Sequence, residues 1–164
     1  MNIFFLSFNP KIAAEYHCDK HVVKMILETA QLLYTAHWVA SPRDTLPQNA
    51  YKQTHYNHPS AIWVRESLDN YKWLCELGLA LCAEYTHRYK RTHLTQSHLV
   101  WLSLHPPSLP AIGITRIRLA MPDEYKQPNP VKAYRAYYIG AKQRFLHYSG
   151  RSVPEFLSKI RIDN

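Results

Sequence analysis

Apolar residues recur every three to four positions over residues 22–33, and this spacing predicts an amphipathic α-helix. Directly before it stands the segment His17-Cys18-Asp19-Lys20-His21, which puts five titratable or nucleophilic side chains on the first turn and a half of the same helix. In such a helix His17 and His21 share a face, whereas Asp19 points about 200° away from His17, because each residue turns the helix by about 100°. Core helices seldom need so many polar groups. The segment is therefore a candidate functional site.

The composition favours a mainly α fold, with one compact domain spanning residues 1–164. Aromatic residues make up 13% of the chain and only 4 glycines are present, which is typical of packed helices rather than of a turn-rich sheet protein. Asparagine caps helices and proline suits the first helical position, so Asn9-Pro10 and Asn129-Pro130 predict helix starts. A short extended segment at 2–8 precedes the first start, and a long proline-rich loop at 105–128 precedes the second.

The remaining helix boundaries follow from the same local signals. We expect a helix or helix pair that ends near His37, followed by a loop over 41–57. A helix at 60–66 and a longer one that begins at the cap Ser67 and ends at about Tyr85 come next. Further helices are expected at 96–104, from 129 to about 148, and near 152–155.

The chain carries no sign of membrane insertion or export. No apolar run approaches the roughly 18 residues of a membrane span, and residues 2–6 lack the basic flank of a signal peptide. We therefore expect a cytoplasmic protein without a membrane partner. The three cysteines, Cys18, Cys75 and Cys82, include no Cys-x-x-Cys pair and are expected to be reduced core thiols.

Charge is divided unevenly along the chain. Residues 1–85 hold 7 Lys and Arg against 8 Asp and Glu, whereas residues 86–164 hold 13 against 4. This asymmetry is typical of a protein that binds nucleic acid or phosphate. A basic surface that only aids solubility has the same composition.

Basic residues cluster in three segments of the second half, at 88–93, at 116–118 and at 132–144, and aromatic residues are interspersed in the first and the third. Each segment alone is typical of a solvated face, but together they favour contact with DNA, because affinity for phosphates grows with each neutralised charge. The candidate nucleic-acid contacts are Lys20, Lys24, Arg65, Arg88, Lys90, Arg91, His93, Arg116, Arg118, Lys126, Lys132, Arg135 and Arg144.

A metal site is a weaker interpretation. His17 and His21 are an i, i+4 pair, and Asp19, His55 or His58 could add a ligand. The spacing fixes no third ligand, and with ten histidines in the chain such a pair also arises by chance. We therefore expect neither a bound metal nor a cofactor, and a metal-dependent hydrolase is the third choice of function.

Two polar motifs allow both a catalytic and a structural interpretation. Asp19 lies among His17, Lys20 and His21, and this cationic setting keeps a carboxylate ionised and able to stabilise positive charge on a sugar. An Asp on a helix surface paired with a nearby Lys is equally ordinary. Likewise, Asn57-His58-Pro59 is either a helix-capping turn or an exposed loop that presents His58 to a substrate.

Two resemblances follow from these motifs. The segments 17–25, 57–63, 84–89 and 121–126 resemble a family of small phage-type proteins without an assigned reaction. More distantly, residues 1–93 are similar in layout to the pyrimidine-dimer DNA glycosylase/lyases: a short N-terminal segment, a helix with a charged stretch, a turn with a histidine, and a helix ending in Glu-x-x-x-Arg-aromatic.

The second resemblance implies a compact, mainly helical enzyme whose nucleophile is the N-terminal amine. Because Asn2 is too bulky for efficient removal of the initiator methionine, Met1 would supply that amine. The resemblance places Asp19 in the role of the family's catalytic Glu and makes Lys20 and Lys24 phosphate contacts.

The sequence thus predicts a DNA-binding protein that acts as a DNA glycosylase/AP lyase on a damaged or modified base. The candidate catalytic residues are Met1, Asp19, His17, His21 and His58. The alternative is a non-catalytic phage accessory factor that binds nucleic acid or protein. The base, the strand preference and the oligomeric state stay open.

Overall fold

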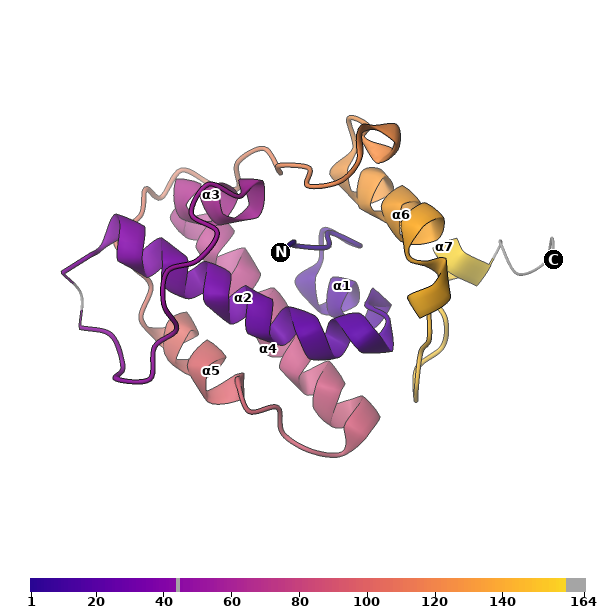
Figure 1. Ribbon diagram of the computed structural model, residues 1–164, viewed down its shortest axis with the longest axis horizontal. Helices are drawn as coiled ribbons and strands as arrows, with labels where there is room; N and C mark the ends of the chain where they lie inside the picture. The colour runs from indigo at the N-terminus through magenta and orange to yellow at the C-terminus, as the bar shows by residue number, and fades with distance from the viewer. Residues whose placement is uncertain (44, 159–164) are drawn as a thin grey trace.

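The computed structural model describes residues 1–43 and 45–158, and within them it contains helices and no β-strand (Figure 1). The mainly α class is confirmed. The α-helices are α1 (Pro10–Tyr16), α2 (Asp19–Ala40), α3 (Pro59–Glu66), α4 (Leu68–Tyr89), α5 (Gln96–Leu104), α6 (Pro130–Ala141) and α7 (Glu155–Ser158), with the 3₁₀ turns η1 (Asp123–Tyr125) and η2 (Gln143–Phe145).

The predicted helix starts are confirmed by their caps. Asn9 accepts hydrogen bonds from the backbone N–H groups of residues 11 and 12, and Asn129 accepts one from that of residue 132. Ser67 caps α4 in the same way through the N–H of Asn70. His58 caps α3 with its ring nitrogen. These starts depend only on neighbouring residues, which is why the sequence predicts them well.

Two helix predictions are wrong. The helix of residues 22–33 does not include His17, because α1 ends at Tyr16 and the extended backbone of His17 and Cys18 (ψ 134° and 161°) breaks the chain before α2 begins at Asp19. The last long helix ends at Ala141 rather than near residue 148, since the chain turns away through η2.

The core lies between the two 22-residue helices α2 and α4, with α1, α3 and α5 packed against them. Gly78 on α4 allows this packing. A Cβ atom there would lie 2.9 Å from side-chain carbons of both Leu99 on α5 and Thr29 on α2. The cysteines are buried free thiols, as predicted. None of the helices in the described part of the chain is long and apolar enough to cross a membrane.

The N-terminal segment runs between this helical layer and α6 (Figure 1). Residues 3–6 are buried, whereas Phe8 at the end of the predicted segment 2–8 is 59% exposed. The Phe4 ring stacks on His21 of α2 with centroids 4.5 Å apart and meets Tyr138 of α6 edge-on at 5.4 Å. The Phe5 ring contacts Trp63 of α3 at 5.1 Å. The chain's first residues are therefore held from both sides by helices that follow much later.

Residues 105–129 form an ordered loop that returns along α3 and α4 toward this segment. The backbone of Pro110 accepts a hydrogen bond from Leu68 N–H, and that of Thr115 accepts one from the Trp63 indole. Near its end, Ala120 accepts a hydrogen bond from the Asn2 side chain. The loop thus reaches the beginning of the chain.

Candidate active site

The N-terminal amine of Met1 faces a carboxylate of α2, that of Glu28. The amine nitrogen lies 3.7 Å from Glu28 Oε1, and Lys24 Nζ lies 3.7 Å from the same oxygen. The Met1 side chain is only 3% exposed, so its packing fixes the position of the amine. Glu28 Oε2 is buried and has no hydrogen-bond partner within the described residues. A carboxylate oxygen without a partner is costly to bury, and it is available to accept a proton.

Asn2 fixes the backbone next to the amine. Its side-chain Nδ2 donates to Ala120 O at 2.8 Å, and its Oδ1 accepts hydrogen bonds from Ile3 N–H at 2.8 Å and from the Tyr134 hydroxyl at 3.0 Å. The bonds to Ala120 and Tyr134 tie Asn2 to residues far along the chain. The amine of Met1 is therefore presented in one orientation, which is what a nucleophile requires.

His58 lies in the electrostatic field of the same pair. Burial lowers the pKa of His58, the positive charges of the N-terminal amine and of His55 lower it further, and Glu28 raises it. Since Nδ1 of His58 accepts the cap hydrogen bond from Ser60 N–H at 3.1 Å, the neutral ring carries its proton on Nε2. His55 has a left-handed backbone with φ 50°, a strained conformation for a residue other than glycine.

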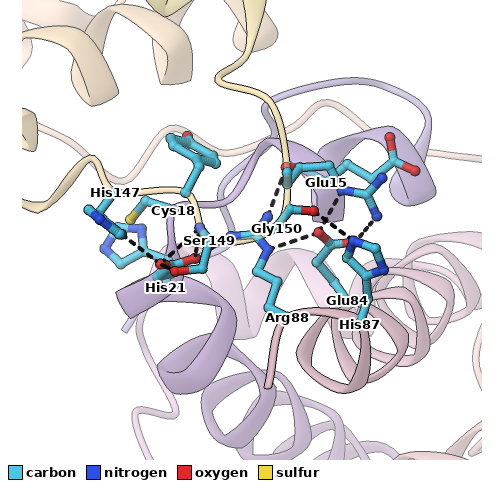
Figure 2. A network of polar contacts seen from close by, with 12 residues as sticks. Glu15, Cys18, His21, Glu84, His87, Arg88, His147, Ser149 and Gly150 are labelled. Atoms are coloured by element: carbon cyan, nitrogen blue, oxygen red, sulfur yellow. Dashed lines mark hydrogen bonds and ion pairs between the residues drawn. The ribbon is translucent and has the colours of Figure 1, made fainter. Parts of the chain in front are cut away.

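Asp19 does not contribute to this group. Glu28 follows it by nine residues on the same helix, so the two lie about 13 Å apart along the axis at 1.5 Å per residue. Both Asp19 oxygens are occupied elsewhere: Arg88 Nη1 donates to Oδ1 at 3.0 Å, His147 Nδ1 donates to Oδ2 at 2.9 Å, and Ser149 donates from its backbone and its hydroxyl. Figure 2 shows these three partners, Arg88, His147 and Ser149. Burial raises the pKa of Asp19, but the hydrogen bonds from Ser149, His147 and Arg88 outweigh it and lower the pKa to about 2.

His17 and His21 are buried beside Phe4 and Tyr138. His17 is 0% exposed and lies 2.6 Å from Ala13 O through Nδ1, and His21 is 6% exposed and lies 2.7 Å from the Tyr138 hydroxyl. Burial lowers the pKa of His17 to about 4 and that of His21 to about 3. Both rings are neutral at pH 7 and shielded from a DNA-sized substrate.

The two histidines also do not form the expected helical metal pair, because His17 precedes the helix. Their ring centroids are 6.5 Å apart. Within residues 1–43 and 45–158, His, Cys, Asp and Glu side chains form no group of three or more that could hold a metal ion.

Two of the predicted DNA contacts are internal instead. Arg88 has a fully buried side chain, and Arg135 donates to Leu6 O while its guanidinium lies over the rings of Tyr16 and Phe156. Both arginines therefore hold the fold together.

Other predicted contacts are bound to protein groups but reach solvent. Arg118 pairs with Glu66 at 2.6 Å, and Arg65 donates to Tyr56 O. Half-buried His93 lies 3.2 Å from Val23 O. The exposed cations of the predicted set are Lys20, Lys24, Lys90, Arg91, Arg116, Arg118, Lys126, Lys132 and Arg144.

A cavity of about 780 Å³ lies beside the N-terminal segment, between residues 114–119 and 126–130. Its lining includes Arg116, Arg118 and Lys126, so it combines open space with positive charge. An apolar cavity of about 280 Å³ lined by Phe5, Phe8, Trp63, Trp73, Ile114 and Ile117 adjoins it through shared residues.

The sequence prediction missed Glu28. The signal that could have found it is a carboxylate within the apolar stripe of α2, where Met25, Ile26 and Thr29 are all buried. A charged side chain in such a stripe needs a partner or a function. The partner is the N-terminus, which no spacing rule connects to residue 28.

A comparison with protein families matched residues 1–97 to the pyrimidine dimer DNA glycosylases. Neither the curated proteins nor the solved structures gave a match. The matched residues contain Met1, Glu28 and His58, and they cover more than half of the chain. By this match, the chain belongs to the pyrimidine dimer DNA glycosylase family, whose members act on DNA.

Proposed function

We propose that this protein is a DNA glycosylase/AP lyase that uses the amine of Met1 as its nucleophile. The observation that carries this proposal is the 3.7 Å approach of that amine to the buried carboxylate of Glu28. Family membership supports glycosylase chemistry in general. The choice of nucleophile and carboxylate rests on the geometry of this chain.

The proposed reaction takes place at C1′ of the sugar. The lone pair of the neutral amine attacks C1′, the bond from C1′ to the base breaks, and the base leaves with the bonding electrons and takes up a proton from water. Glu28 accepts a proton from the attacking nitrogen and passes it to the ring oxygen as the sugar opens. The product is a protonated imine between Met1 and the DNA, and Glu28 stabilises its positive charge.

The carboxylate role thereby passes from Asp19 to Glu28. Asp19 is assigned to the fold, as are His17 and His21, because all three are committed to internal contacts. His58 stays a candidate proton carrier, since it titrates in the field of Met1 and Glu28. Lys20 and Lys24 precede Glu28 on α2 and are proposed phosphate contacts.

A borohydride trap tests the proposal. Borohydride delivers hydride to the imine carbon and converts it into a stable amine, so the wild-type protein should become covalently linked to DNA with an abasic site. A short N-terminal extension should abolish the adduct. Glu28→Gln should reduce the rate of trapping by about 10²–10³, the usual effect of removing one charge-stabilising or proton-transferring group.

The matched control is Glu76→Gln, a change of the same kind at an exposed carboxylate of α4, which should trap at the wild-type rate. An extended protein that traps as well as wild type would refute the amine mechanism. Intact mass measurement of the purified chain establishes that Met1 is its first residue.

The alternative, a non-catalytic factor that binds nucleic acid or protein, predicts DNA binding without any adduct. The same experiment separates it from the enzyme. The damaged or modified base, the resemblance to phage-type proteins and the metal-dependent hydrolase stay predictions from the sequence.

A further inference from the structure

The chain segment 142–149, which lies beyond the family match, is fastened to the start of α2 by a single carboxylate, that of Asp19 (Figure 2). Ser149 donates its hydroxyl to Asp19 Oδ2 at 2.6 Å and its backbone N–H at 2.9 Å and 3.0 Å to the two oxygens. His147 donates its ring N–H at 2.9 Å, and its carbonyl accepts from Asp19 N–H at 2.8 Å. We call Asp19, His147 and Ser149 the clasp.

The clasp is anchored in the interior of the protein. Arg88 joins Asp19 to Glu84 with distances of 3.0 Å and 2.8 Å, and it also donates to the backbone of Glu15 at 3.0 Å. Arg151 binds both oxygens of Glu84 from the C-terminal side. Two guanidinium groups are thus balanced by two carboxylates, which keeps the buried charges compensated.

The clasped segment brings further cations beside α2. Lys20 of α2 places its Nζ 3.9 Å from the centre of the Phe145 ring, and Arg144 lies over the same ring at 5.7 Å. Lys142 lies over Tyr137 at 4.8 Å. In the part of the chain that the structure describes, no carboxylate forms an ion pair with Lys20, Lys142 or Arg144.

The same cations approach the proposed active site. Besides its burial, His21 experiences the positive charges of Lys142, Lys24 and Lys20, which lower its pKa. Lys24 lies one turn after Lys20 and contacts Glu28. Along α2, Lys20 and Lys24 therefore connect the Phe145 ring with the carboxylate that faces the N-terminal amine. We call Lys20, Lys142, Arg144 and Phe145 the cationic wall.

We propose that Asp19 is a positioning residue for DNA binding: the clasp holds Lys142, Arg144 and Phe145 beside Lys20 as a wall that contacts the phosphates of the DNA strand entering the Met1–Glu28 site. This inference rests on the proposed function, since it assumes a DNA substrate. It gives the segment outside the family match a task in that function. An exposed face carrying cations on aromatic rings suits a polyanion with stacked bases.

A double-mutant cycle tests the inference. His147→Ala/Ser149→Ala loosens the clasp and leaves every lysine and arginine in place, and Lys142→Gln/Arg144→Gln neutralises the wall. The ligand is a DNA duplex with an uncleavable tetrahydrofuran abasic analogue, so that binding is measured without chemistry. The matched control is Lys11→Gln/Lys72→Gln, which removes two exposed charges elsewhere.

The wall variant should weaken binding about tenfold or more and reduce the slope of log affinity against log salt by up to about 2, or roughly one unit for each lost phosphate contact. The clasp variant should weaken binding about fivefold and also reduce the slope, since the cations remain but are no longer held in place. Combining both changes should weaken binding no further than the wall variant alone. The control pair should reduce the slope by much less.

Additive effects in the combined variant would overturn the inference, because they would mean that the clasp acts through stability and not through the wall. The same holds if the clasp variant keeps the wild-type salt slope. Should the double clasp variant unfold, Ser149→Ala alone completes the cycle, since the backbone donor of residue 149 remains.

Trapping separates this inference from the proposed function. At saturating abasic DNA the clasp variant should trap at the wild-type rate, because Met1 and Glu28 are untouched. If the wild-type protein binds the duplex but forms no adduct, the proposed amine mechanism is refuted. The double-mutant cycle still tests whether the clasp positions the wall. If trapping is intact but the effects of the clasp and wall variants on binding are additive, the positioning role of the clasp is refuted and the proposed function stands.

Discussion

Asp19 illustrates how much the surroundings of a residue decide about its role. Its cationic neighbours in the sequence favour a catalytic carboxylate, yet its partners in space are Arg88, His147 and Ser149. Glu28 shows the reverse: its neighbours in the sequence suggest no catalytic role, whereas its surroundings in space do. It lies in an apolar stripe, and one of its oxygens is left without a hydrogen bond, which leaves it free to act on the amine of Met1.

At this scale, Asp19→Asn should cost stability. The lowering of the Asp19 pKa from 3.8 to about 2 corresponds to about 2 kcal/mol of stability above pH 4, which is lost as the pH falls through about 2. We expect the free energy of unfolding in urea at pH 7 to fall by about 2–3 kcal/mol, because the Asn leaves Arg88 partly uncompensated.

The matched control for this variant is Asp123→Asn, at an exposed carboxylate of η1, which should change stability little. If Asp19→Asn keeps the wild-type stability and loses trapping, a catalytic role for Asp19 is restored.

At the scale of the element, the break between α1 and α2 turns two histidines inward. His17 caps α1 and His21 lies on the first turn of α2, and both face Phe4 and Tyr138 instead of solvent. A continuous helix would have left part of this segment on the surface. The buried pair makes the fold sensitive to acid.

The free energy of unfolding should therefore fall as the pH is lowered from about 6.5 toward 4. The folded protein lowers the pKa of His17 to about 4 and of His21 to about 3, so the unfolded chain binds these protons more tightly. Stability from this source is fully present above about pH 6.5 and decreases below it by up to about 2.7 kcal/mol per pH unit for the two groups. Urea denaturation at several pH values measures the slope.

His21→Gln should reduce this slope by up to about 1.4 kcal/mol per pH unit, because one histidine whose pKa the fold lowers is removed. His105→Gln, at an exposed histidine, should leave it unchanged. An unaltered slope in His21→Gln would contradict the assignment of the acid sensitivity to this pair.

At the scale of the whole molecule, the family match ends at residue 97, inside α5, whereas the hydrophobic core includes residues beyond that point. Leu99 and Leu102 of α5 and Tyr134 and Tyr138 of α6 are fully buried in the same cluster as the helices of the matched part. Arg151 also compensates Glu84 from beyond the match. The matched residues alone thus lack a large share of their core.

A chain that ends at residue 97 should consequently show no cooperative thermal unfolding by circular dichroism, whereas the full chain should. Removing α6 exposes Phe4 and the N-terminal segment, and removing the end of α5 uncovers Gly78 and its surroundings. Cooperative unfolding of the short chain would mean that residues 1–97 form an independent unit.

The sequence by itself determined the features that depend on neighbouring residues. The starts of α1, α3, α4 and α6 follow from a cap and a proline or a serine within a few positions, and the end of α5 follows from Pro106 and Pro107. The composition was sufficient to predict the mainly α class. Counting charges, in contrast, included Arg88, because a count does not separate a buried guanidinium from an exposed one. It also included the half-buried Arg135, which is bound to Leu6 O.

Only the tertiary structure decided the site. The amine of Met1 meets Glu28 because the N-terminal segment is held between α2 and α6, and Asp19 meets Ser149 130 residues later. Such contacts depend on how separate elements pack, and a periodic pattern along one helix carries no information about them. The continuous apolar spacing also concealed the break at His17 and Cys18, because backbone angles there are fixed by the packing of α1 on α4 and not by the side-chain pattern.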